Sequence, residues 1–136
     1  MAAAGYSGTP LAKKLGIRDG HGVAVVDDPG HLASLVAPLP PGATLAAALE
    51  AADVTLCFVT TKESLERRIG RLGEAIFPDR ALWIAWPKRA SKVETDMTED
   101  VVREVALPLG LVDTKVCAID ETWSGLRLVW RRGRRG

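Results

Sequence analysis

The chain has 136 residues, of which 47% are hydrophobic and 26% charged, and its formal net charge is +1. These values are ordinary for one globular domain with a core of its own, and they give the chain as a whole no bias toward nucleic acid or an acidic membrane. The first residues have neither the basic nor the apolar region of a secretory signal, and no apolar stretch is long enough to span a bilayer. We therefore expect a single cytoplasmic domain over residues 1–136, with no membrane partner.

The N-terminal residues 1–20 predict an arm that contains a short helix. Thr9 can cap this helix, Pro10 suits its first position, and Gly16 can end it in a left-handed conformation. The next run, residues 22–27, is β-branched and apolar on both faces. Such a run is typical of a buried strand in a parallel sheet.

Residues 28–42 predict turns on either side of a short helix at 31–37, because proline and glycine gather at both ends of that segment. Residues 43–52 are ambiguous. Their alanines favour a helix, whereas Thr44 and Leu45, which follow a Pro-Gly turn, suit a short edge strand. We expect a strand followed by a turn.

Two further buried strands are predicted at 54–59 and 81–86, where apolar residues form short uninterrupted runs. Between them, Thr60 and Glu63 have the spacing of a capping box and predict the start of an amphipathic helix. This helix is expected to end at Phe77, which precedes a proline.

The C-terminal part of the chain predicts one more helix and then a hairpin. Asp96 and Glu99 again have capping-box spacing, and Gly110 can terminate the helix that they begin. The β-type runs at 115–119 and 126–131 are separated by a loop so short that only an antiparallel pair can form.

Strands that alternate with helices imply right-handed crossovers and a parallel sheet with helices on both faces. We predict a three-layer, Rossmann-like α/β domain, whose mostly parallel sheet of five or six strands is closed by the C-terminal antiparallel hairpin. Residues 133–136 are expected to form a frayed basic tail. Cys57 and Cys117 lie in β-type runs and predict buried free thiols, and no metal site is expected.

Ligands of such sheets bind beyond the carboxyl ends of the strands. The residues at these positions are polar, charged or aromatic, and the loop of the hairpin joins them if the first hairpin strand runs parallel to the others. The candidate ligand-binding residues are therefore Asp27, Asp28, Thr60, Trp86, Lys88, Arg89, Lys92, Glu121 and Trp123. The sequence identifies no catalytic residue among them.

Each candidate also has a purely structural interpretation. Asp27 and Asp28 precede a Pro-Gly turn, and we favour a turn signal over catalysis there. Thr60 is more typical of a helix cap than of a ligand contact. The basic loop can clamp a phosphate or a carboxylate, although such loops are commonly just solvated. Trp86 and Trp123 either stack on a ligand or cover the end of the sheet, and we give both interpretations equal weight.

Four segments resemble a family of actinobacterial proteins that is classified as a domain of unknown function: residues 6–11, 85–88, 96–104 and 116–126. This resemblance covers nearly the whole chain and implies no activity. The order of elements also resembles the later half of class I methyltransferase folds. The turn at 27–31, however, has one glycine and a proline where those enzymes have a glycine-rich loop, so no cofactor is expected and S-adenosylmethionine (SAM) is possible only in an atypical site.

The sequence thus predicts a non-catalytic or specialised binding domain, whose partner at the carboxyl rim is an anionic small molecule or a protein. One alternative is a small-molecule methyltransferase with an atypical SAM site. Another is weak nucleic-acid binding through the C-terminal arginines, four of which lie among the glycines of the tail. We consider nucleic acid the weaker alternative, because no aromatic platform is interleaved with the tail arginines.

Overall fold

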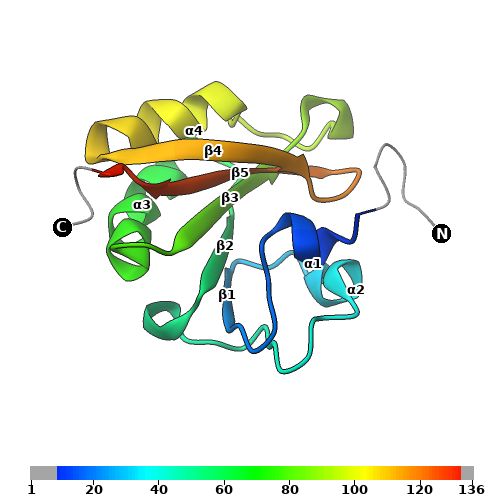
Figure 1. The fold of residues 1–136 in the computed structure, drawn as a ribbon. Coiled ribbons are helices and arrows are strands. Elements are labelled where there is room, and N and C mark those ends of the chain that lie inside the picture. Colours follow the sequence, from blue (N-terminus) through cyan, green and yellow to red (C-terminus); the bar gives the residue numbers. More distant parts are fainter. Residues whose placement is uncertain (1–8, 133–136) are drawn as a thin grey trace.

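One mixed sheet of five strands forms the centre of the computed structural model of the chain, which describes residues 9–132. The strands are β1 (Val23–Val26), β2 (Val54–Phe58), β3 (Ala81–Pro87), β4 (Leu111–Ala118) and β5 (Trp123–Trp130). Their order in the sheet is β1-β2-β3-β5-β4 (Figure 1). Strands β1, β2 and β3 are parallel, and β5 is antiparallel to both β3 and β4. The predicted Rossmann-like α/β fold with a C-terminal antiparallel hairpin is confirmed.

The helices are α1 (Leu11–Lys14), α2 (Leu32–Val36), α3 (Lys62–Ile76) and α4 (Glu99–Ala106), with short 3-10 turns η1 (Leu49–Ala51), η2 (Arg89–Ser91) and η3 (Leu107–Leu109). Helices α3 and α4 cover one face of the sheet, and α1 and α2 cover the other. Among the described residues, no helix is long and apolar enough to cross a membrane. The predicted tail at 133–136 and the first part of the predicted arm lie outside the described residues.

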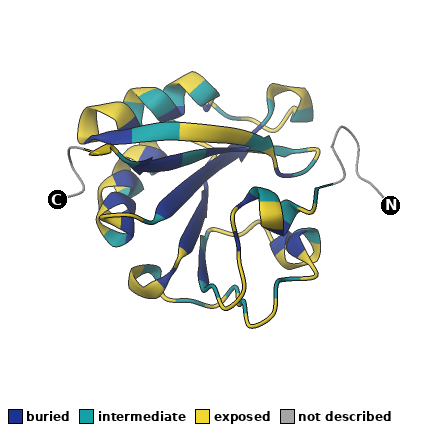
Figure 2. Cartoon of the chain, viewed as in Figure 1, coloured by how far each residue is buried: buried dark blue, intermediate teal, exposed yellow. Residues whose placement is uncertain are grey.

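The core under α3 and α4 follows from the apolar stripe that the sequence predicts. Leu65, Ile69 and Leu72 of α3 are buried, and they belong to one apolar cluster with Ile84 and Trp86 of β3. Figure 2 shows β3 as buried along its length, which is expected for a strand with neighbours on both sides and helices on both faces.

A second core lies on the opposite face and is centred on Trp83. The indole is fully buried, and its Nε1 donates a hydrogen bond of 3.0 Å to the carbonyl oxygen of Leu15 at the end of α1. Leu32 and Val36 of α2 belong to the same cluster. Helix α1 has only one turn, so this buried hydrogen bond is one of the contacts that attach it to the sheet.

The long helix α3 begins one residue later than predicted. Its cap is Thr61, whose Oγ1 accepts a hydrogen bond of 3.1 Å from the amide of Ser64. The predicted cap, Thr60, is exposed and lies before the helix. Thr60 and Thr61 each carry a hydroxyl group that can cap a helix, so residue type alone could not decide between them.

The capping pair predicted for α4 is also wrong. Thr98 is the cap, and its Oγ1 accepts a hydrogen bond of 3.1 Å from the amide of Val101. Asp96 serves the other helix, because its Oδ1 accepts from the backbone amide of Lys62 at 2.8 Å. Asp96 therefore joins the loop before α4 to the N-terminus of α3.

The ambiguous segment 43–52 lies along the free edge of β1. Thr44 forms an isolated parallel bridge with Gly22, and the amide of Val23 donates to the carbonyl of Thr44 at 2.8 Å. A Cβ atom on Gly22 would lie only 2.8 Å from the Cβ of Ala47, so the close approach requires glycine. The expected strand is reduced to this single bridge, and a 3-10 turn, η1, follows it.

The two cysteines are free, as predicted, but they differ in burial. Cys57 is fully buried in β2, and burial raises the pKa of its thiol to about 12. Cys117 is only half-buried, so the prediction of a buried thiol is wrong at this position. The reason is that Cys117 lies on the edge strand β4, part of which is exposed in Figure 2.

Candidate functional site

The loops that follow β3 and β4 lie at the same edge of the sheet. Strand β4 runs in the direction of β3, because both are antiparallel to β5, which lies between them. Pro87 pairs with Trp123, and the amide of Lys88 donates a hydrogen bond of 2.7 Å to the carbonyl of Thr122. The basic loop and the hairpin loop are therefore neighbours on the carboxyl rim, as the sequence predicts.

A cavity of about 590 Å³ opens at this rim, on the side of the sheet that α3 and α4 cover. We call it the rim cavity. Trp86 contributes the end of β3, Lys88 and Arg89 contribute the basic loop, and Ser124 contributes the start of β5. The remaining wall comes from Val93 and the segment 95–99.

The hydroxyl of Ser91 forms two hydrogen bonds within the basic loop. The hydroxyl of Ser91 donates to the carbonyl of Lys88 at 2.6 Å and accepts from the amide of Val93 at 3.2 Å. Lys92, between them, has a φ of 63°, a left-handed conformation that closes the turn. These bonds, with that from the amide of Lys92 to the carbonyl of Arg89, form the turn that carries Lys88 and Arg89.

The facing wall is attached to the end of β2. Thr95 Oγ1 donates to the carbonyl of Thr60 at 2.6 Å and accepts from the amide of Met97 at 3.0 Å. The Met97 side chain is buried in the core beneath. Both walls of the rim cavity are therefore joined to the sheet.

The charged groups of the rim cavity are not equivalent. Among the described residues, no ion pair includes Lys88 or Arg89. The two acidic residues of the lining are both engaged: Asp96 accepts from the N-terminus of α3, and Glu99 pairs with Arg103. The cations are consequently available to a ligand, whereas the carboxylates already have partners.

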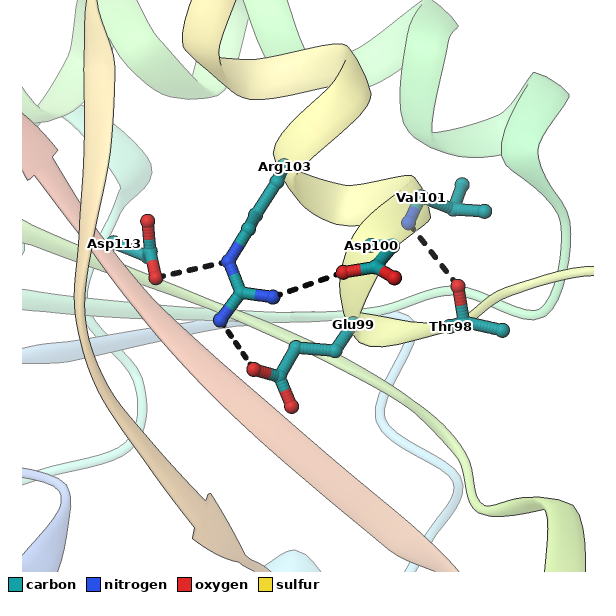
Figure 3. A network of polar contacts seen from close by, with 6 residues as sticks. All are labelled: Thr98, Glu99, Asp100, Val101, Arg103 and Asp113. Carbon is teal, nitrogen blue, oxygen red and sulfur yellow. Dashed lines mark hydrogen bonds and ion pairs between the residues drawn. The ribbon is translucent and has the colours of Figure 1, made fainter.

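Figure 3 shows the network in which Glu99 pairs with Arg103. The guanidinium of Arg103 contacts Glu99, and it also donates to Asp113 on β4 at 3.0 Å and to Asp100 at 3.1 Å. Hydrogen bonds to Glu99 and Asp113 raise the pKa of Arg103 above its ordinary value. The network joins α4 to β4 and gives Glu99 a cationic partner, which Glu99 shares with Asp100 and Asp113.

The two aspartates predicted after β1 do not line the rim cavity. Asp27 has a φ of 58°, and its Oδ2 forms an ion pair of 2.7 Å with Arg68 of α3. Asp28 Oδ1 accepts from the amide of Gly30 at 2.8 Å, which is the local bond of an aspartate turn. The contacts of Asp28 therefore agree with its structural interpretation.

Trp123 lies on the face of the sheet opposite to Trp86. Its ring packs edge-on against Phe58, with ring centroids 5.0 Å apart and an interplanar angle of 88°. The structure therefore brings Trp86 to the rim cavity and places Trp123 in the other core. Lys92 and Glu121 are exposed in the two neighbouring loops, and neither lines this cavity.

One polar pair at the rim escaped prediction. Nε2 of His31 lies 2.7 Å from Oδ2 of Asp120, although the two residues are 89 positions apart. Asp120 Oδ1 accepts from the amides of Thr122 and Trp123 at 2.8 and 2.7 Å. The pair joins the start of α2 to the β4–β5 loop, and no local spacing in the sequence signals it. No group of three potential metal ligands occurs within residues 9–132.

No protein-family model matches the chain and no curated protein sequence matches it, so the resemblance to the actinobacterial family stays a prediction. Solved structures do share the fold. A putative type 11 methyltransferase from Sulfolobus solfataricus is 12% identical with a TM-score of 0.53, over 82% of this chain and 85% of that one. Magnesium protoporphyrin IX methyltransferase from Synechocystis PCC 6803, with bound SAM, is 11% identical with a TM-score of 0.52, over 88% and 74%. A protein of the NADB-Rossmann superfamily from Streptococcus agalactiae is 9% identical with a TM-score of 0.52, over 94% and 71%.

The residues after β1 do not form the usual cofactor loop of this fold. A glycine-rich turn would present free backbone amides, but Pro29 has no N–H group and the amide of Gly30 donates to Asp28. Strand β1 is also an edge strand of the sheet, with only the Thr44 bridge beyond it. The described residues therefore have no second strand beyond β1 at which the strand order reverses, and it is at such a reversal that Rossmann-like sheets form their ligand crevice. The chain therefore has the Rossmann-like methyltransferase fold without the glycine-rich loop in which that fold commonly holds its cofactor.

Proposed function

We propose that this domain binds a small anionic molecule in the rim cavity. The observation that carries the proposal is the pairing of its charges: Lys88 and Arg89 line the cavity and take part in no ion pair of the described residues, whereas both acidic lining residues are engaged. A cavity of about 590 Å³ also lies in the size range of small-molecule sites. It therefore favours a small ligand over the flat contact typical of a protein partner.

The chemistry of the lining indicates the class of ligand. A guanidinium fork and an ammonium group together suit a phosphate or a carboxylate. Trp86, which is 6% exposed, adds an apolar edge to the wall, and Ser124 adds a hydroxyl. We infer a ligand that combines one anionic group with a small apolar part.

Replacing both Lys88 and Arg89 with alanine should weaken binding of inorganic phosphate or sulfate by about tenfold or more. The reason is that a hydrogen bond to a charged group is worth about 1.5–3 kcal/mol. The free energy of unfolding should change by less than about 1 kcal/mol, because exposed charges contribute little to stability. Isothermal calorimetry and thermal melts measure the two quantities.

Lys92→Gln is the matched control, since Lys92 is a basic residue of the same loop that does not line the rim cavity. We expect this variant to bind phosphate like the wild type. If the control weakens binding as much as the double variant does, the anion senses only the general charge of the loop, and the proposed site is wrong. Wild-type affinity in the double variant would contradict it equally.

A SAM-dependent methyltransferase is the second candidate function. It is favoured by the shared fold, because one of the solved structures with this fold is described with bound SAM. The turn after β1 weighs against it, because Pro29 and Asp28 leave no free glycine amides there for a cofactor. The two candidates differ most directly in whether the chain binds SAM itself. Nucleic-acid binding through the tail stays a prediction, since residues 133–136 lie outside the described residues.

A further inference from the structure

A second cavity, of about 510 Å³, lies between α1 and the β4–β5 hairpin. Its charged lining residues are Lys13, Lys14, Arg18, Lys115 and Arg127, and no acidic residue lines it. We call it the basic cavity. It lies on the face of the sheet that α1 covers, opposite to the rim cavity, so the two cavities are separate.

The strand register places two of these cations directly opposite each other. Lys115 of β4 pairs with Arg127 of β5 across the antiparallel hairpin. Like charges in this arrangement destabilise a sheet unless something neutralises them. Lys115 Nζ also donates to the carbonyl of Lys14 at 3.3 Å, which brings the end of α1 to the same place.

Among residues 9–132, no ion pair includes Lys13, Arg18, Lys115 or Arg127. Arg127 is half-buried, and its guanidinium donates to the neutral hydroxyl of Thr114 at 3.1 Å. A partly desolvated guanidinium without a carboxylate is a group that an external anion can satisfy.

We propose that the basic cavity binds a small molecule with at least two linked phosphate groups. Cations line it from α1, from the turn that follows α1 and from the hairpin, and a diphosphate carries enough anionic oxygens to pair with cations on both sides. Its volume is within the range of small-molecule sites, which favours a compact ligand over a nucleic-acid strand. The inference does not depend on the rim cavity.

The test is calorimetric titration with inorganic pyrophosphate and, separately, inorganic phosphate at low ionic strength. Wild-type protein should bind pyrophosphate about tenfold or more tightly than phosphate, because more charge-assisted hydrogen bonds form. The exposed single variants Lys115→Gln and Arg18→Gln should each weaken pyrophosphate binding severalfold while their melting temperatures stay close to that of the wild type. In the rim variant Lys88→Ala/Arg89→Ala, which lacks the proposed phosphate site of the rim cavity, equal affinity for both anions would overturn the proposal. Unchanged pyrophosphate affinity in both Lys115→Gln and Arg18→Gln would overturn it as well.

The rim variant Lys88→Ala/Arg89→Ala serves as the matched control and should retain pyrophosphate binding. Loss of pyrophosphate binding in this control would overturn the assignment to the basic cavity. A single-stranded oligonucleotide supplies the other comparison. Binding that tightens steadily with oligonucleotide length and exceeds pyrophosphate binding would show a nucleic-acid surface and overturn the small-molecule proposal.

Cys117 offers a second readout in the same protein. Burial raises the pKa of its thiol, and the charges of Lys14 and Lys115 act in the opposite direction. Pyrophosphate that neutralises these lysines should slow alkylation of Cys117 at mildly alkaline pH, because less thiolate is present. An alkylation rate that pyrophosphate leaves unchanged would contradict binding at this position.

Discussion

Replacing Trp83 with alanine is expected to lower the free energy of unfolding by about 3–5 kcal/mol, the range for removing a large buried aromatic side chain. Trp83 is fully buried in the core between α1 and the sheet, and its indole satisfies the carbonyl of Leu15. The substitution therefore leaves a cavity and also an unpaired polar group. Denaturant unfolding followed by circular dichroism measures the loss.

Trp83→Phe separates the two contributions. It keeps an aromatic ring but removes the Nε1 donor and leaves a smaller cavity than alanine does, so it should cost at least about 1–3 kcal/mol, the penalty of a buried carbonyl without a partner. The alanine variant should then be clearly less stable than the phenylalanine variant. A loss below about 1 kcal/mol in Trp83→Ala would mean that α1 is not held to the sheet as described.

Replacing Asp120 with alanine should cost about 2–3 kcal/mol at neutral pH, because three hydrogen bonds disappear at once. Its carboxylate accepts from the amides of Thr122 and Trp123 and contacts His31. These contacts fix the β4–β5 loop against α2 at the carboxyl rim. Asp120→Asn is the matched control, since it can still accept from both amides and should lose less.

The cost of the Asp120 substitution should depend on pH in a defined direction. Burial alone would raise the pKa of this carboxyl, but the hydrogen bonds from His31, Trp123 and Thr122 together lower it below its ordinary value. A carboxyl whose pKa is lower in the folded state stabilises the protein above its unfolded pKa, and that stability is lost as the pH falls through the folded pKa. The difference between wild type and Asp120→Ala should therefore shrink in acid. A constant difference down to strongly acidic pH would contradict this account.

The strands could be predicted because their signals are local, and the common rim followed on the condition that β4 runs parallel to β3. The apolar runs at 54–59 and 81–86 are too short for helices and too apolar for loops, so each specifies a buried strand. The length of the 120–125 loop leaves only an antiparallel pair, and the direction of β4 then follows from the sheet order. These two facts place the basic loop and the hairpin loop at one edge.

Other features depend on contacts that no local pattern carries. Trp123 lies on the face of the sheet opposite to Trp86. Trp123 pairs with Pro87, which directly follows Trp86 in β3, and successive side chains of a strand point to opposite faces. Asp96 caps the helix that precedes it in sequence, at Lys62, instead of the one that follows. Cys117 is only half-buried because it lies in an edge strand, and only the order of the strands in the sheet reveals that position.

The central claim is that the rim cavity binds an anion, and a nuclear magnetic resonance titration of the wild-type protein tests it most directly. Inorganic phosphate should shift the indole signal of Trp86 and the backbone amides of Lys88, Arg89, Val93 and 95–99, which line this cavity. SAM should shift none of the amides of the turn at 27–31. Rim signals that stay unchanged with phosphate, or shifts of the 27–31 turn with SAM, would contradict the account and favour the methyltransferase candidate.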